Sequence, residues 1–251
     1  RFRNVTGVQT CALPISFDAA RQAMARAIVP LARAEPARRL AQLVAAPEVG
    51  SLRSFEVTTI LDGSAFTTVT ARLRYAGENL LVYGDTSDPG VSAPQLQALA
   101  QLFDRHLVRE AERVFGALPD VDGDGRITVL FTPAVNRLTR REDCLLRGYP
   151  TGFFFPVDQL ERLPHSNRGE IFYAFVPDPV DRYSCTHKEE DVVRLIQATF
   201  LHELQHLISF NQRVLARGGG FEENWLNEGL SQVAEERSEE HTSELQSRFG
   251  I

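Results

Sequence analysis

Two histidines and a glutamate lie together in the segment 202–206, His-Glu-Leu-Gln-His, inside a stretch with helical hydrophobic periodicity. The apolar positions of residues 191–209 recur as on one face of a helix: Val193, Ile196, Phe200, Leu204 and Leu207. Side chains four residues apart in a helix project from one face, so His202 and His206 can reach the same metal ion. Both fall outside the apolar stripe, and Glu203 beside them is placed to accept a proton from a metal-bound water. The pattern predicts a helix that carries two metal ligands and a general base.

A third ligand is expected, because zinc sites that activate water keep three protein ligands and one open position. Glu228 is the best candidate, since it lies near the start of a second predicted helix, residues 224–236. The connection 211–223 contains three consecutive glycines at 218–220, which end the first helix and allow a turn. We therefore predict a Zn²⁺ site formed by His202, His206 and Glu228. The alternative is an ordinary pair of surface histidines with an unrelated surface glutamate.

Several side chains near the predicted site could support the metal ligands or the packing around them. The outward ring nitrogens of two metal-bound histidines need hydrogen-bond acceptors. Gln232, Glu235 and Glu236 follow Glu228 on the same predicted helix, and the sequence does not choose among them. Trp225 is expected to be a packing anchor rather than a platform for substrate.

The motif and its surroundings resemble a known family. HELQH at 202–206 followed by WLNEG at 225–229 resembles the gluzincin metallopeptidases. DVDGDGRITVLF at 120–131, GYPTGFF at 148–154 and SNRGEIFY at 166–173 resemble the hyicolysin-type neutral metallopeptidases, and the similarity runs from about 54 to 236. The resemblance implies a secreted bacterial zinc endopeptidase with His202, His206 and Glu228 as ligands and Glu203 as catalytic base. One departure is the gap of 21 residues between His206 and Glu228, which is longer than in the best-known gluzincins.

The order of predicted elements indicates an α+β, or mixed α/β, zincin-like catalytic domain preceded by a small β-rich segment. Strands are predicted at 55–60, 66–75, 79–83, 126–132 and 171–176, and an amphipathic helix at 93–115. The apolar strand 171–176 is a candidate edge strand for pairing with an extended substrate, although a core strand is the more ordinary interpretation.

The two ends of the chain read as translated sequencing adapter rather than protein. VTGVQTCALPI at 5–15 and RSEEHTSELQS at 237–247 match a common adapter and its reverse complement. We assign 1–16 and 237–251 to this artefact, so they are not expected to belong to the native fold. The rest divides into a linker or propeptide remnant (17–50), a β-rich N-terminal segment (51–91) and a zincin-like catalytic domain (92–236) that is truncated at its C-terminal end. The resemblance implies an oxyanion-binding Tyr or His beyond this end.

A second candidate metal site precedes the strand at 126–132. Asp120, Asp122 and Asp124 match the opening of a calcium-binding loop. Phe131 stands where an EF-hand places its bidentate glutamate, and it cannot bind a metal. Two interpretations stay open, a loop that binds Ca²⁺ and a plain helix-to-strand turn.

Cysteine use and charge narrow the class of protein. Outside the adapter-like segment, Cys144 and Cys185 remain as a candidate disulfide, with two free thiols as the alternative. The net charge of −6 argues against nucleic acid and anionic membranes as main partners. No apolar run approaches the roughly 20 residues of a membrane span. The expected partner is therefore a protein or peptide substrate, and the oligomeric state is not set by the sequence.

Two other functions are alternatives to the endopeptidase. A zinc aminopeptidase of the same clan is disfavoured because no GxMEN-type motif precedes His202. A noncatalytic, metal-stabilised surface binding module is disfavoured because a structural metal site has no use for a base at Glu203.

Overall fold

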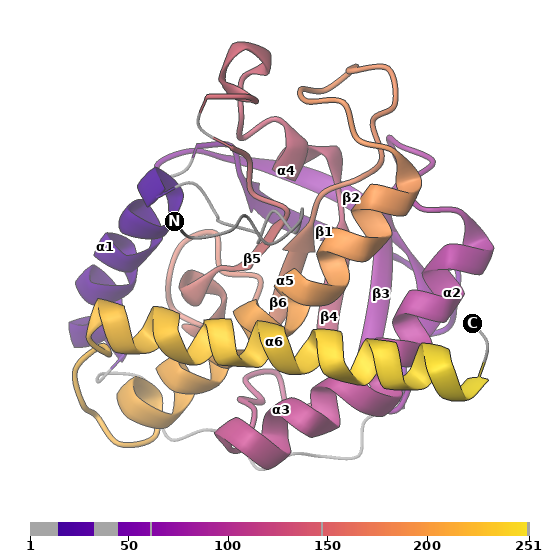
Figure 1. The fold of residues 1–251 in the computed structure, drawn as a ribbon. Coiled ribbons are helices and arrows are strands. Elements are labelled where there is room, and N and C mark those ends of the chain that lie inside the picture. The colour runs from indigo at the N-terminus through magenta and orange to yellow at the C-terminus, as the bar shows by residue number, and fades with distance from the viewer. Residues whose placement is uncertain (1–14, 33–44, 61, 147, 250–251) are drawn as a thin grey trace, which may run out of the picture.

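A computed structural model describes residues 15–32, 45–60, 62–146 and 148–249, and these build one six-stranded mixed sheet with helices packed against it (Figure 1). The strands are β1 (Leu52–Thr58), β2 (Phe66–Ala76), β3 (Leu80–Asp85), β4 (Ile127–Phe131), β5 (Gly152–Phe154) and β6 (Ile171–Ala174). Their spatial order is β1-β2-β3-β4-β6-β5. The first three strands form an antiparallel meander, β3, β4 and β6 are parallel, and β5 pairs antiparallel with β6. The strands of the predicted β-rich segment 51–91 thus share one sheet with the later strands.

The helical elements are α1 (Ile15–Ala32), α2 (Ala93–Leu102), η1 (Phe103–Leu107), α3 (Val108–Phe115), α4 (Pro133–Asn136), η2 (Arg141–Asp143), η3 (Pro156–Gln159), α5 (Glu189–Phe210), η4 (Asn211–Leu215) and α6 (Asn224–Phe249). In Figure 1, α5 lies in front of the sheet, and α6 runs across the end of α5. Three acidic residues occupy the first turn of α5, where they complement the positive end of the helix dipole. Gly218, with φ of 63°, ends the helical run that follows α5.

The predicted helix 93–115 is continuous but contains a π-helical turn, η1, between α2 and α3. This turn carries Asp104, which is buried and whose carboxylate accepts hydrogen bonds from Tyr75 Oη at 3.0 Å and from Asn79 N at 2.6 Å. The irregular turn therefore presents a carboxylate to the β2–β3 turn, where it satisfies backbone and hydroxyl donors that would otherwise be buried without acceptors.

Aromatic stacking joins the helices to the sheet. The ring of Phe200 on α5 stacks on Phe103 with centroids 4.0 Å apart, and it meets Phe172 of β6 edge-on at 5.3 Å. Three more members of the predicted apolar stripe, Ile196, Leu204 and Leu207, are buried as well. Such contacts fix α5 against β6 and β5 at one side of the sheet, and they place residues 202–206 beside its β5 edge.

The segment expected to be a linker or propeptide remnant contains α1, whose last turns pack against the rest of the protein. Ile28 and Val29 form a small apolar cluster with Leu160, Phe210 and Val214. Residues 1–14 and 33–44 lie outside the described part of the chain, and the backbone of α6 extends to residue 249. The assignments to a propeptide remnant and to adapter sequence stay predictions. Among the described residues, no helix has the length and hydropathy to cross a membrane.

Candidate metal centre

Three side chains from two helices converge at the end of α5 that α6 crosses. His202 and His206 lie one turn apart on α5, and their Nε2 atoms are 3.2 Å apart. Glu228, in the second turn of α6, brings Oε2 to 3.8 Å from His202 Nε2 and Oε1 to 3.7 Å from His206 Nε2. Both histidine side chains are buried, whereas that of Glu228 is 26% exposed. The packing of α6 on α5 therefore closes the gap of 21 residues between His206 and Glu228.

The spacing of these three groups fits one zinc ion. Zinc–ligand distances of about 2.0–2.1 Å in tetrahedral geometry place neighbouring ligand atoms roughly 3.3–3.4 Å apart. The observed separations of 3.2, 3.7 and 3.8 Å lie close to this value. Two imidazoles with one carboxylate are also a donor set that catalytic zinc uses.

A buried carboxylate lies behind one of the histidines. Glu235 Oε2 is 3.4 Å from His202 Nδ1, and both side chains are 6–7% exposed. A carboxylate at this nitrogen favours the tautomer with the proton on Nδ1, which leaves the lone pair of Nε2 toward Glu228. Gln232 and Glu236, the other acceptors considered from the sequence, are exposed. Of the three candidates, Glu235 is therefore the one that lies against the outward ring nitrogen of His202.

The carboxylate of Glu203 faces the edge strand β5. Glu203 has no exposed surface, and its Oε2 accepts a hydrogen bond of 3.2 Å from the backbone N–H of Phe154. Because Thr151 O accepts a hydrogen bond from Phe175 N, the residue that follows β6, alternate N–H groups of β5 point away from β6. The edge of β5 that is not paired with β6 therefore faces α5.

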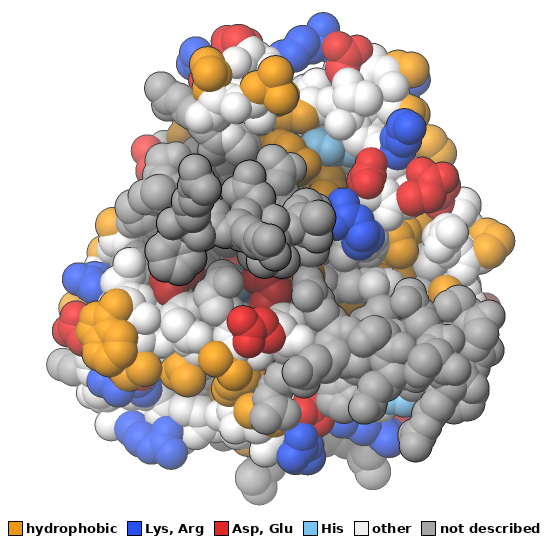
Figure 2. Space-filling view, viewed as in Figure 1, with side chains coloured by type: hydrophobic (Ala, Val, Ile, Leu, Met, Phe, Trp, Pro, Cys, Tyr) orange, Lys and Arg blue, Asp and Glu red, His pale blue; other side chains and the backbone are white. Residues whose placement is uncertain are grey.

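For the strand predicted at 171–176, the core interpretation is confirmed and the edge interpretation is wrong, and the role expected for Trp225 is wrong as well. Residues 171–174 form β6, which lies between β4 and β5, so the edge strand beside the candidate centre is β5 (Gly152–Phe154). Trp225 does not anchor packing, since it is 74% exposed in the first turn of α6. The buried face of that helix is made by small and polar residues instead: Asn227, Ser231, Ala234 and Glu235. In Figure 2, hydrophobic and acidic side chains both lie at the surface in the region where α6 runs.

The aspartates of the candidate calcium loop also lie together. Carboxylate oxygens of Asp120, Asp122 and Asp124 fall within 4.8 Å of one another. All three are capped by backbone of the same loop, since Asp124 N donates to Asp122 at 3.3 Å, Gly125 N to Asp120 at 3.0 Å and Arg126 N to Asp124 at 2.7 Å. Asp122 lies at the exposed surface of the loop, where partial desolvation, and next the charge of Asp124, raise its pKa to about 6. Calcium binding stays a prediction, and the plain turn stays the alternative.

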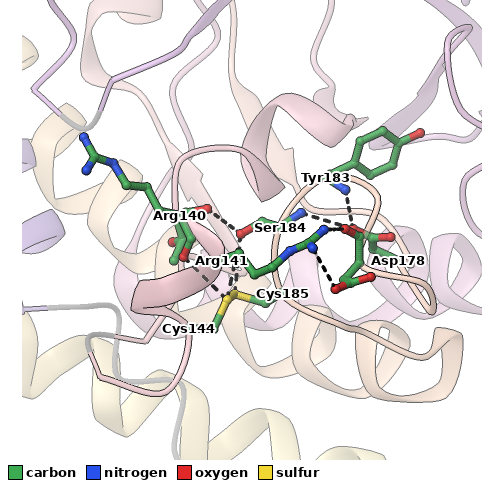
Figure 3. Close-up of a disulfide and its surroundings, with 9 residues drawn as sticks. Arg140, Arg141, Cys144, Asp178, Tyr183, Ser184 and Cys185 are labelled. Atoms are coloured by element: carbon green, nitrogen blue, oxygen red, sulfur yellow. Dashed lines mark hydrogen bonds and ion pairs between the residues drawn. A yellow bond between two sulfur atoms is a disulfide. The ribbon is translucent and has the colours of Figure 1, made fainter.

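Cys144 and Cys185 form a disulfide, with Cα atoms 5.7 Å apart (Figure 3). The bridge joins the segment that leads into β5 to the segment that leads into α5. The second segment is folded around Asp178, whose buried carboxylate accepts hydrogen bonds from the backbone N–H groups of Tyr183 at 2.7 Å and Ser184 at 3.2 Å. The bridge therefore ties the segment at Cys144 to one that is held by buried hydrogen bonds.

Comparison with known proteins gives one informative match. No family model matches the chain. The chain is similar to the neutral metalloprotease ShpI of Staphylococcus hyicus, with 27% identity over 205 residues, which cover 80% of this chain and 43% of that protein. The chain therefore spans less than half the length of this relative. The similarity supports a metalloprotease family for this chain.

Proposed function

We propose that the chain is the catalytic part of a secreted zinc-dependent endopeptidase of the gluzincin clan, in its hyicolysin-type family. His202, His206 and Glu228 would hold the zinc ion, and Glu203 would act as general base. The observation that carries the proposal is the convergence of the three ligand groups from α5 and α6, with separations of 3.2–3.8 Å. The similarity to a neutral metalloprotease supports it.

The residues of the chain account for the proton transfers of peptide hydrolysis. A zinc ion bound here would polarise the scissile carbonyl and lower the pKa of a bound water toward about 7. Glu203 would accept the proton of the attacking water and deliver it to the leaving amine. The N–H of Phe154, at 3.2 Å, holds the carboxylate of Glu203 in place. Burial of the carboxylate keeps bulk water from competing for it.

The proposed site for an extended substrate is the surface beside Glu203, where β5 itself is packed on α5 through Thr151 and Phe154. A binding mode that reads backbone groups rather than chain ends would favour cleavage inside a polypeptide. The disulfide between Cys144 and Cys185 supports an extracytoplasmic location, because such bridges are rare in reducing compartments.

The test compares the zinc-loaded protein with its Glu203→Gln variant on an unfolded protein substrate. We expect the variant to retain one zinc per chain and to lose about 10²–10⁴-fold in rate, the usual contribution of a general base. Glu236→Gln, on the exposed side of α6, is the matched control and should digest normally. Equal digestion by the Glu203→Gln variant would contradict the mechanism.

A second comparison separates the endopeptidase from an aminopeptidase. Peptides with acetylated and with free N-termini should be cleaved at similar rates by an endopeptidase. A requirement for the free amine would assign the chain to the aminopeptidase branch instead. Zinc binding without hydrolysis of either peptide would point to the noncatalytic module.

A further inference from the structure

The edge strand β5 is tied to α5 by two hydrogen bonds that lie along both elements. Thr151 Oγ1, at the start of β5, is 2.7 Å from Thr199 Oγ1 on α5. Further along, Phe154 N donates to Glu203 Oε2 at 3.2 Å. Thr199 precedes Glu203 by one helical turn, so both project toward β5 from the same face of α5. The threonine pair thus lies one helical turn before the contact between Phe154 and the proposed base, Glu203.

Because the hydrogen bond between the two threonines is buried, it contributes strongly to the spacing between β5 and α5. Thr151 is 4% and Thr199 is 2% exposed, so water does not compete for either hydroxyl. Replacement of one hydroxyl by a methyl group would leave its partner facing an apolar atom, which costs more than an exposed hydrogen bond would.

The opposite side of β5 is equally constrained. A Cβ atom added to Gly152 would lie 2.4 Å from the ring of Phe172 and 2.9 Å from Tyr173 O, so β5 packs on β6 with no room for a side chain there. The disulfide between Cys144 and Cys185 fixes the approach to both elements. The position of β5 between β6 and α5 is therefore set from both sides, and the threonine pair sets it on the α5 side.

We propose that Thr151 and Thr199 are positioning residues for the candidate centre. Their hydrogen bond sets the distance between β5 and α5, and so the contact from Phe154 N that holds the carboxylate of Glu203. The consequence for catalysis rests on the proposed function, whereas the effect on the Phe154–Glu203 contact does not.

The first test measures amide hydrogen exchange in Thr199→Val, Thr199→Ser and Thr151→Val. We expect the Phe154 amide of both valine variants to exchange about tenfold faster relative to the amide of Val129 in β4, as loss of one hydrogen bond would give. The serine variant keeps the hydroxyl and should restore slow exchange. Thr132→Val is the matched control, because Thr132 is fully buried and its hydroxyl donates to Asp85 at 2.6 Å, away from β5. It should leave the Phe154 exchange ratio unchanged.

A kinetic test on the same variants checks the effect on the proposed base. Thr199→Val should lower kcat for a peptide substrate several-fold with little change in KM and in zinc per chain, while Thr132→Val should change none of them. Unchanged Phe154 exchange in both valine variants, or an equal change in Thr132→Val, would overturn the positioning role. Absence of peptidase activity in a protein that includes the expected downstream oxyanion-binding residue would refute the proposed function and leave the exchange result to stand alone.

Discussion

The structure gathers potential metal ligands in two places, and the two differ in how their ligands are held. At the candidate centre, His202, His206 and Glu228 come from two helices that tertiary contacts bring together. In the aspartate loop, Asp120, Asp122 and Asp124 come from five consecutive residues. The centre thus depends on the whole fold, whereas the loop can form locally.

The groups behind the ligands differ as well. At the centre, buried partners from other parts of the chain hold the functional side chains: Glu235 lies 3.4 Å from His202, and Phe154 N donates to Glu203. In the loop, the capping donors are N–H groups of the loop itself. Tertiary contacts of the first kind are typical of sites whose geometry serves chemistry, whereas caps of the second kind also occur in plain turns.

Exchange of one carboxylate for an amide at each place should give the largest difference between them. Glu228→Gln is expected to weaken zinc binding by more than about 100-fold, beyond the range for residues that only support a ligand. Asp122→Asn makes the same chemical change in the loop and should leave zinc affinity unaltered. Competition with a chelator of known affinity measures both. Equal losses would mean that zinc does not bind between α5 and α6.

The support behind His202 should have a smaller effect on zinc. Glu235→Gln keeps the shape of the side chain but weakens the acceptor at Nδ1, so we expect zinc affinity to fall about 10–100-fold. Glu236→Gln, exposed on the next position of α6, is the control and should bind zinc normally. If both variants bind zinc as tightly as the parent, the His202–Glu235 contact does not orient the ligand.

The smallest effect is expected in the aspartate loop and depends on pH. The pKa of Asp122 rises from its usual 3.8 to about 6, so the folded protein holds a proton that the unfolded chain has lost between these values. Stability from this group is therefore lost as the pH rises through 6. In chelator at pH 8, Asp122→Asn should melt about 1–3 °C above the parent, and the difference should shrink toward pH 4.

Calcium then decides between the two interpretations of the loop. If the loop binds Ca²⁺, millimolar calcium should stabilise the parent and reverse the order of the two melting temperatures, because the ion needs the carboxylate of Asp122. If the loop is a plain turn, calcium should leave the order unchanged.

Local patterns predicted the elements that have a clear period. The helix predicted at 191–209 corresponds to α5 within two residues at its start, and the strand at 126–132 to β4. The strand β5 was missed because its three residues, all buried, are too few to show a period and lie among turn residues. That β5 rather than β6 forms the edge depends on pairing between distant segments, which no local pattern encodes.

The candidate site likewise has some features that the sequence predicts and others that depend on tertiary packing. The spacing of His202 and His206 follows from helix geometry, so it could be predicted from the chain alone. The choice of Glu235 over Gln232 and Glu236 depends on how α6 rotates against α5. Trp225 was misjudged because its size suggests burial, whereas its place in the first turn of α6 leaves it in solvent. Tertiary packing decided each of these cases.

The covalent bridge between Cys144 and Cys185 also acts on the unfolded chain. It closes a loop of 41 residues that contains β5, η3 and β6. A closed loop of this length lowers the conformational entropy of the unfolded ensemble by an amount worth about 4 kcal/mol. That is comparable to the total margin of about 5–15 kcal/mol by which a domain of ordinary size stays folded. The disulfide does not involve the proposed ligands, and it nevertheless raises the temperature at which the structure around them unfolds.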